Sequence, residues 1–323
     1  HSSRSRLRIL KAVAESRLFQ PSATMMKKAF AWRDLTILAS LAAATGFSSI
    51  PTVPKLVEIK TSLGPVTGFN AGTTTSSGTA SCDTFYGIPY AAPPTDANRF
   101  RPPQPRMPWT EPRPVILREE ETVVCPQNDY GDPRINVEED CLFLNVFTPH
   151  DAPSDGSPLA VVVFIHGGGF IEGSGLFDIS GQLFPINGGS HLCADGGVVV
   201  VTLNYRLGVF GFLATDELLV EQGTAGNMGI QDQRKALEWV QENAAAFGGD
   251  PTRVTIVGQS VGAQSVAYHL TMNRSAPLFS AAVLMSAIGT VRPFESASAY
   301  GNAFANAAGC SSRGGASVLA CLR

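Results

Sequence analysis

One serine in the chain lies in a sequence context that could make it a nucleophile. Ser260 is the centre of a Gly-x-Ser-x-Gly pattern with Gly258 and Gly262. Residues 253–257 are typical of a short buried strand and residues 261–271 of a helix. A tight strand-to-helix turn exposes the serine hydroxyl, and the helix N-terminus favours a developing negative charge. The pattern also arises by chance in glycine-rich loops, but this context favours a nucleophile for acyl transfer.

A second chemical element is a run of glycines after another predicted strand. Residues 159–165 are continuously apolar, which suits a strand that is covered on both faces. They lead directly into His166 and residues 167–169, which are all glycine. Consecutive glycines let the backbone approach a tetrahedral intermediate, and N–H groups fixed there would stabilise its charge. The alternative is an ordinary flexible loop.

A serine nucleophile requires a base, and the base requires an acid that orients it. After Ser260 the sequence offers one histidine, His269, and one acid, Glu295. His269 comes nine residues later in the predicted helix, about 13 Å along its axis and on the opposite side. We therefore interpret His269 as a helix-surface or packing histidine. Glu295 is expected to cap or precede a helix that begins near residue 297.

The elements that must position these groups alternate between strands and helices. Further buried strands are expected at residues 197–203 and 280–287, and residues 138–149 are expected to contain a strand. A long amphipathic helix is expected to open at Gly229 and to end at residues 248–251. This alternation indicates an α/β fold with a mostly parallel central sheet.

The segment before these elements is poor in helix signals. Residues 57–66 predict a first hairpin, and residues 70–81 predict a loop because they are rich in Gly, Ser and Thr. Residues 85–105 contain so many prolines that we expect an extended surface segment without a helix.

Composition limits the class of protein. The 323 residues are 44% hydrophobic and 16% charged, which is enough for a sizeable core in one large domain or two small ones. The net charge of −3 and the lack of a basic block argue against a nucleic-acid partner. No apolar stretch after the first 45 residues is long enough to span a bilayer.

The N-terminal residues are typical of processing sequence. Residues 1–24 are interpreted as an upstream segment that is not native to the protein. Residues 25–45 combine a charged start, an apolar run and small residues, which predicts a secretory signal peptide; a buried N-terminal helix is the alternative. Residues 46–323 then form the folded domain. A secreted chain could carry one N-glycan, at Asn273.

The six cysteines of a secreted chain should be mostly paired. Fifteen complete pairings are possible. Cys125 with Cys141, and Cys310 with Cys321, would each close a short loop. Two other cysteines, at positions 82 and 193, form a long-range pair or stay free and buried. We see no metal-ligand pattern, and we expect neither a metal nor a cofactor.

Several of these stretches together resemble a known family, the type-B carboxylesterases, which are the cholinesterase-like branch of the α/β-hydrolases. The resemblance covers residues 55–323 and implies an α/β-hydrolase fold whose sheet stops after the strand that follows the serine turn. It also implies a serine that is acylated during hydrolysis of a small-molecule ester. The matching stretches are residues 85–94, 139–149, 166–170, 204–213, 226–251 and the serine turn.

The resemblance assigns roles by position. Ser260 is the implied nucleophile, and the backbone N–H groups of Gly168, Gly169 and Val261 form the implied oxyanion hole. His166 matches a structural residue, so we interpret it as a hydrogen-bonding residue that holds the glycine loop and not as the base.

The resemblance also implies structural pairs. The family pairs its cysteines locally, which supports the disulfides Cys125–Cys141 and Cys310–Cys321. It further implies two ion pairs that are structural and not catalytic, Arg99–Glu139 and Arg206–Asp232.

The chain departs from the family next to the serine. Gln259 and Val261 stand where the family has Glu and Ala, so one negative charge is missing. The segment between Cys125 and Cys141 contains no tryptophan, and Tyr130 is its one aromatic residue. Both departures favour a neutral ester over a cationic choline ester.

Family members are about two hundred residues longer, and in them the additional part carries the acid, the base and the last strands. Three hypotheses follow. The chain is a truncated esterase, a short inactive hydrolase-like protein, or a non-catalytic adhesion or binding domain. The retained serine and glycine run favour the esterase.

Overall fold

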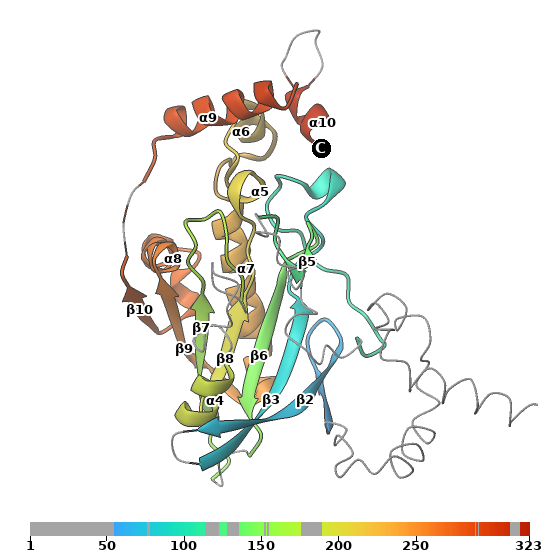
Figure 1. Ribbon diagram of the computed structural model, residues 1–323, viewed down its shortest axis with the longest axis vertical. Helices are drawn as coiled ribbons and strands as arrows, with labels where there is room; N and C mark the ends of the chain where they lie inside the picture. The colour runs from blue at the N-terminus through green and yellow to red at the C-terminus, as the bar shows by residue number, and fades with distance from the viewer. Residues whose placement is uncertain are drawn as a thin grey trace, which may run out of the picture. The chain divides into compact units, whose positions relative to one another are not determined.

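The described part of the chain begins at residue 55. Figure 1 shows the computed structural model, which describes residues 55–75, 78–113, 123–127, 136–151, 153, 155–175, 189–287, 289, 291–310 and 317–323. The predicted upstream segment 1–24 and signal peptide 25–45 lie outside these residues.

An eight-stranded mixed sheet carries the fold, with the strand order β1-β2-β3-β6-β8-β7-β9-β10. Strands β8, β7, β9 and β10 are mutually parallel. The other strands pair antiparallel, including β6 with β8. The expectation of a mostly parallel sheet therefore holds for the half that carries Ser260. The strands are β1 Leu56–Lys60, β2 Pro65–Thr75, β3 Gly78–Pro89, β6 Phe143–Pro149, β7 Leu159–Ile165, β8 Val199–Leu203, β9 Gly249–Gln259 and β10 Ala281–Met285.

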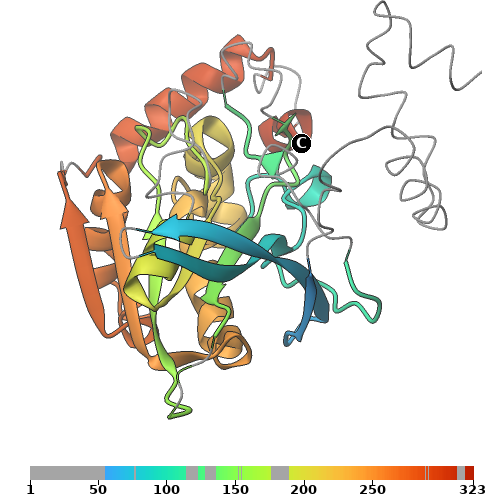
Figure 2. The ribbon, with the colours of Figure 1, turned by 60° about the horizontal axis from the view of Figure 1, so that its bottom comes forward.

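Two further strands of the described residues form a separate short pair, β4 Val123–Val124 with β5 Asn136–Val137. Figure 2 shows the β2–β3 hairpin lying across the direction of the parallel strands, which reflects the twist of the sheet.

Helices cover both faces of the sheet. Residues of α7 and α8 pack with Val199, Val201 and Leu203 of β8, whereas Cys193 of α4 packs with Val200 on the other face. Successive residues of β8 therefore contact helices on opposite faces of the sheet, as expected for a strand that is covered on both faces. The α-helices are α4 Ser190–Gly196, α5 Gly208–Phe212, α6 Asp216–Gln222, α7 Met228–Asn243, α8 Val261–Thr271, α9 Phe294–Ala307 and α10 Val318–Leu322. The short 3-10 helices are Asp96–Asn98, Ala244–Phe247 and Ala276–Leu278.

Most predicted elements form, but three differ. The loop expected at 70–81 is instead most of the β2–β3 hairpin, in which backbone pairing overrides the weak strand preference of Gly, Ser and Thr. The surface segment expected at 85–105 begins inside the sheet, where Phe85 is fully buried in β3. The strand expected at 280–287 forms as β10, but its Val283 is 44% exposed.

All six cysteines are paired. The expected disulfides Cys125–Cys141 and Cys310–Cys321 are confirmed. Cys82 and Cys193, whose state the sequence left open, form a third disulfide that joins β3 to α4. In the part of the chain that the structure describes, no helix combines the length and apolar character needed to cross a membrane.

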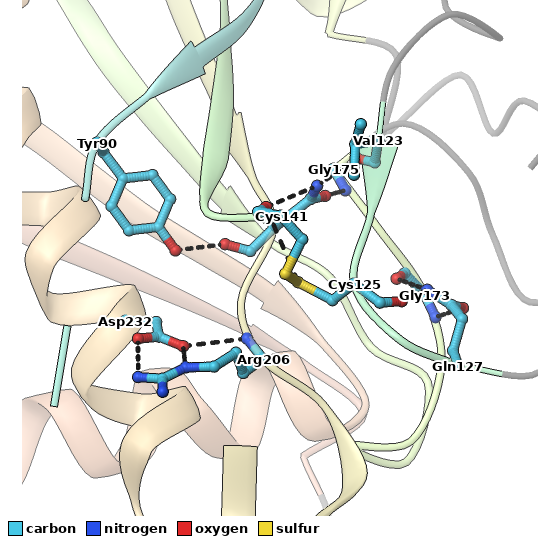
Figure 3. The surroundings of a disulfide bond; sticks show 10 residues. Tyr90, Val123, Cys125, Gln127, Cys141, Gly173, Gly175, Arg206 and Asp232 are labelled. Atoms are coloured by element: carbon cyan, nitrogen blue, oxygen red, sulfur yellow. Dashed lines mark hydrogen bonds and ion pairs between the residues drawn. A yellow bond between two sulfur atoms is a disulfide. The ribbon is translucent and has the colours of Figure 1, made fainter. Parts of the chain in front are cut away.

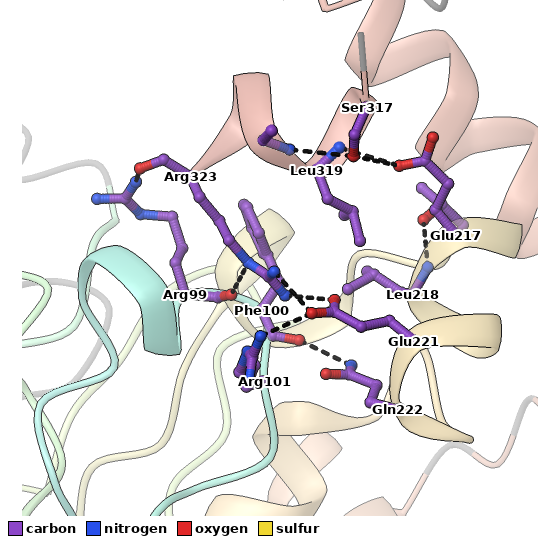
Figure 4. A network of polar contacts seen from close by, with 12 residues as sticks. Arg99, Phe100, Arg101, Glu217, Leu218, Glu221, Gln222, Ser317, Leu319 and Arg323 are labelled. Carbon is purple, nitrogen blue, oxygen red and sulfur yellow. Dashed lines mark hydrogen bonds and ion pairs between the residues drawn. The ribbon is translucent and has the colours of Figure 1, made fainter. Parts of the chain in front are cut away.

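The last helix, α10, is held against α6 by polar contacts (Figure 4). Glu217 of α6 accepts a hydrogen bond from the backbone N–H of Leu319 at 3.0 Å. Glu221 pairs with Arg101 at 2.7 Å and with Arg323 at 2.6 Å. Arg99 extends this network and pairs with Glu139 at 2.8 Å, which confirms the first expected ion pair.

Candidate active site

Ser260 occupies the turn between β9 and α8, where its backbone has φ 56° and ψ −123°. A residue with a side chain rarely adopts a positive φ, so the surrounding structure must enforce this conformation. The Ser260 N–H donates to the Met285 carbonyl of β10 at 2.9 Å, and the Ser260 carbonyl accepts from the Gln264 N–H at 3.0 Å. The turn is therefore held by the neighbouring strand and by its own helix.

The two glycines of the Gly-x-Ser-x-Gly pattern lie at close contacts between backbones. A Cβ on Gly258 would lie 2.3 Å from the Gly262 carbonyl oxygen. A Cβ on Gly262 would lie 2.1 Å from the carbonyl oxygen of Ile165, at the end of β7. Gly258 and Gly262 are thus glycines because β9, α8 and β7 meet there too closely to leave room for a side chain.

The glycine loop after β7 lies directly against the serine turn. A Cβ on Gly167 would lie 2.8 Å from the Gln259 carbonyl oxygen and 3.2 Å from the Ser260 Cβ. Gly168 and Gly169 both have positive φ, at 96° and 65°. The structure therefore brings Ser260 and the glycine run together, as the sequence predicts.

The peptide groups of this loop have defined directions. The Gly168 carbonyl accepts hydrogen bonds from the N–H groups of Ile171 at 3.0 Å and Glu172 at 3.1 Å. Because a trans peptide places C=O and N–H on opposite sides, the N–H of Gly169 points away from that turn. Val261 is the first residue of α8, so its N–H lies among those that lack a partner within the helix.

His166 holds the start of the glycine loop. Its Nδ1 lies 2.9 Å from the Gly167 carbonyl oxygen and must carry the proton, because a carbonyl only accepts. The ring stacks on Tyr205 with centroids 4.3 Å apart, and the Tyr205 hydroxyl donates to the His166 carbonyl at 2.9 Å. Burial lowers the pKa of His166 to about 4, so the imidazole is neutral. This geometry fits the loop-holding function that we expected.

His269 is a packing histidine between α7 and α8. Its side chain is fully buried, with Nδ1 2.9 Å from the Ser275 hydroxyl and Nε2 3.1 Å from the Gln233 side-chain oxygen. Burial lowers its pKa to about 4. Glu295 lies in the first turn of α9, which begins three residues before the predicted start. In the described part of the chain, no hydrogen bond joins either side chain to Ser260.

The other described histidines lie near the opposite end of the parallel strands. Because β6 runs antiparallel to β8, Phe147 pairs with Val200 near the start of β8, and His150 follows β6 at that end. His191 lies in α4, which precedes β8. Among the described residues, no hydrogen bond joins the Ser260 hydroxyl to an imidazole.

Sequence reasoning missed the contacts that hold the site from outside. The Met285 carbonyl anchors Ser260, but a backbone acceptor leaves no signal in the residue type.

The expected ion pair Arg206–Asp232 is confirmed, with both side chains buried and Nε 2.8 Å from Oδ2. The Arg206 backbone N–H also donates to Asp232, so the pair fixes the segment after β8 to α7.

The profile of the carboxylesterase family matches residues 55–323. The chain belongs to the carboxylesterase family. Its relatives include "Esterase E4" of Myzus persicae, 38% identical over 74% of this chain and 41% of that protein. "Acetylcholinesterase" of Gallus gallus is 37% identical over 84% of this chain and 35% of that protein.

Solved structures of PNB esterases share the fold. A thermophilic PNB esterase matches with a TM-score of 0.65 and 38% identity, over 78% of this chain and 48% of that structure. The eight-stranded sheet and its helices thus form an α/β-hydrolase fold. The chain spans about two fifths of the length of the curated relatives it matches.

Proposed function

We propose that this chain is part of a serine carboxylic ester hydrolase in which Ser260 is the nucleophile. One observation carries the proposal: Ser260 has φ 56° in a strand-to-helix turn that packs against the glycine loop. In the reaction, the Ser260 oxygen bonds to the ester carbonyl carbon and gives its proton to a base. The alcohol then leaves with that proton, and water releases the acid from the acyl-enzyme.

The oxyanion hole of the proposed esterase consists of the N–H groups of Gly168, Gly169 and Val261. Two properties of the described structure support this assignment. The Gly169 N–H points away from the turn that the Gly168 carbonyl closes, and the Val261 N–H opens α8 beside the nucleophile. Donors fixed in this way each contribute about 10²–10³-fold to acyl transfer.

The base and its orienting acid come from outside the described residues in this proposal. His166 and His269 are buried and neutral, and each has a nitrogen that is engaged in a hydrogen bond elsewhere. His150 pairs with Asp83 at the far end of the parallel strands. A neutral serine hydroxyl without a base is a weak nucleophile at neutral pH.

We propose a neutral ester as the substrate. The Gln259 side-chain oxygen lies 2.8 Å from where a Cβ on Gly167 would be, so an uncharged amide borders the site beside Ser260. A carboxylate at that position would attract a cationic alcohol group, and an amide does so far less.

We also propose that the protein is secreted. Its three disulfides support this proposal, because disulfides form and persist in oxidising compartments such as the extracellular space. The glycosylation acceptor Asn273 is exposed in the turn after α8. Secretion would be supported if protein recovered from the culture medium lost mass on treatment with a glycosidase. Recovery of the protein from the cytosol with its cysteines reduced would contradict it.

The test of the esterase proposal is chemical rescue of the missing base. We expect the chain to hydrolyse p-nitrophenyl acetate barely faster than its Ser260→Ala variant. Added imidazole should raise the wild-type rate above that of the variant, because imidazole can enter the site and remove the serine proton. Equal rates for the two proteins at every imidazole concentration would favour an inactive hydrolase-like protein or an adhesion domain.

A further inference from the structure

We infer that Gln127 is a positioning residue that fixes the glycine loop, residues 166–175, beside Ser260. The inference rests on the function proposed above. The Gln127 side-chain amide pairs with both main-chain groups of Gly173 (Figure 3). Its Nε2 donates to the Gly173 carbonyl at 2.8 Å, and its Oε1 accepts from the Gly173 N–H at 2.8 Å. This two-bond pairing resembles one step of a β-ladder made by a side chain.

The same amide is also tied to its own segment. Its Nε2 donates a further hydrogen bond to the Cys125 carbonyl at 3.1 Å. Both N–H donors and the oxygen of the amide are thus engaged, which leaves a single orientation for the group. Cys125 is buried and bonded to Cys141, so the amide lies two residues from a position that a disulfide anchors.

Gly173 transmits this restraint to the serine. Gly173 has φ 107°, and a Cβ there would lie 2.5 Å from His166 Nδ1 and 3.0 Å from the Gly167 carbonyl oxygen. Gly167 in turn packs on Gln259 and Ser260. Gly173 therefore cannot move toward His166 and Gly167 without displacing the glycines that face the nucleophile.

A second amide restrains Gly175, two residues further along the loop. Asn204 Oδ1 accepts from the Gly175 N–H at 2.9 Å, and its Nδ2 donates to the carbonyls of Val123 at 2.7 Å and Cys141 at 3.2 Å. The loop is thus attached twice to the segment around the Cys125–Cys141 disulfide (Figure 3). Gln127 acts through Gly173, and its effect on the reaction is one of placement.

The chemistry of Gln127 allows a sharp substitution. Gln127→Glu keeps the shape of the side chain and its acceptor for the Gly173 N–H. It removes both donors and sets a carboxylate against the carbonyls of Gly173 and Cys125, which repel it. Gln127→Met removes all three hydrogen bonds of the amide without adding charge, and it serves if the Glu variant does not fold. Gln104→Glu is the matched control, because that amide makes one local hydrogen bond to Pro102.

The experiment combines hydrogen exchange with labelling of Ser260 by a neutral fluorophosphonate, on the full chain with imidazole present. In the Gln127 variants we expect the amides of Gly173 and Gly175 to exchange roughly tenfold faster or more, because the loop is held by two fewer hydrogen bonds in the Glu variant and by three fewer in the Met variant. The maximal labelling rate should fall by about the same factor, with the half-saturating probe concentration unchanged. Gln104→Glu should leave all three quantities at wild-type values.

The outcomes separate the two proposals. Faster exchange with an unchanged maximal labelling rate would make Gln127 structural only and overturn the inference. Unchanged exchange would overturn it as well. A wild-type chain without label on Ser260 would refute the proposed function itself, and the exchange data would still report on the Gln127–Gly173 pairing.

Discussion

A Cβ atom on Gly258 would lie 2.3 Å from the carbonyl oxygen of Gly262, so β9 and α8 approach each other at backbone distance. Gly262 stands in the same relation to Ile165 of β7, at 2.1 Å. The two glycines therefore define how closely the helix that begins after Ser260 packs on the two strands beneath it. The conformation of the turn at Ser260 depends on this packing.

The first prediction concerns Gly262→Ala. The added methyl group must push α8 away from β7, and overpacking of this kind costs about 1–3 kcal/mol in the free energy of unfolding. Labelling of Ser260 should decline as well, because the turn is displaced. The control is Gly289→Ala, since a Cβ at Gly289 meets no atom within 4 Å. Urea denaturation of both variants measures the effect, and equal stabilities would contradict the packing argument.

The second prediction concerns pH. Burial lowers the pKa of His166 and of His269 to about 4, below the value of about 6.5 for an unfolded chain. The unfolded state therefore binds more protons between these two values. The free energy of unfolding is thus highest above pH 6.5 and falls as the pH drops toward 4, by about 3 kcal/mol for each imidazole.

Denaturation at a series of pH values measures this slope. His269→Gln should lower the stability at neutral pH, because the hydrogen bond to Ser275 is lost. It should also remove roughly half of the histidine-dependent stability change between about pH 6.5 and 4.5, since one of the two described histidines with a lowered pKa is gone. A slope equal to that of the wild type would show that His269 does not titrate as its burial implies.

The third prediction compares two disulfides. Cys82–Cys193 spans 111 residues and Cys310–Cys321 spans 11. In the chain-entropy description the longer loop restricts the unfolded state more, so replacing Cys82 and Cys193 by alanine should cost about 2 kcal/mol more than replacing the other pair. Denaturant unfolding of the two double variants measures the two losses in the free energy of unfolding. A larger loss in the variant without Cys310–Cys321 would contradict the chain-entropy argument.

The fourth prediction concerns the edge strand. Within the described residues β10 pairs with β9 alone, and Val283 and Leu284 are more than 40% exposed. An apolar edge of this kind pairs with other chains. We expect concentration-dependent association in sedimentation experiments, and we expect Val283→Lys to reduce it. Val220→Lys, at an exposed position on α6, is the matched control, and equal effects of the two substitutions would argue against association through β10.

The sequence predicts the parallel half of the fold well, because residue patterns and backbone constraints coincide there. The predicted strand 159–165 and helix 261–271 match β7 and α8 to the residue. The glycines around Ser260 are informative because only glycine fits the contacts that they make. Patterns fail where tertiary pairing decides the structure. Residues 70–81 form strands because β2 and β3 pair with each other, although their own preference for strands is weak.

Long-range partners are the second part that the sequence did not reveal. Cys82 and Cys193 lie far apart in the chain, and nothing in their neighbours indicates that β3 and α4 bring them together. Gln127 is likewise an ordinary polar residue until the loop folds back and presents Gly173 to it. The base is a different case, since none of the described histidines is placed to serve the Ser260 hydroxyl.

Peptide mapping after reaction with a neutral fluorophosphonate tests the central claim, that Ser260 is the nucleophile, most directly. We predict that the label is found on Ser260, that imidazole accelerates its attachment, and that Ser260→Ala abolishes it. Ser286→Ala is the control, because Ser286 is an exposed serine next to the Met285 anchor, and it should label like the wild type. A label on another serine, or undiminished labelling of Ser260→Ala, would contradict the claim.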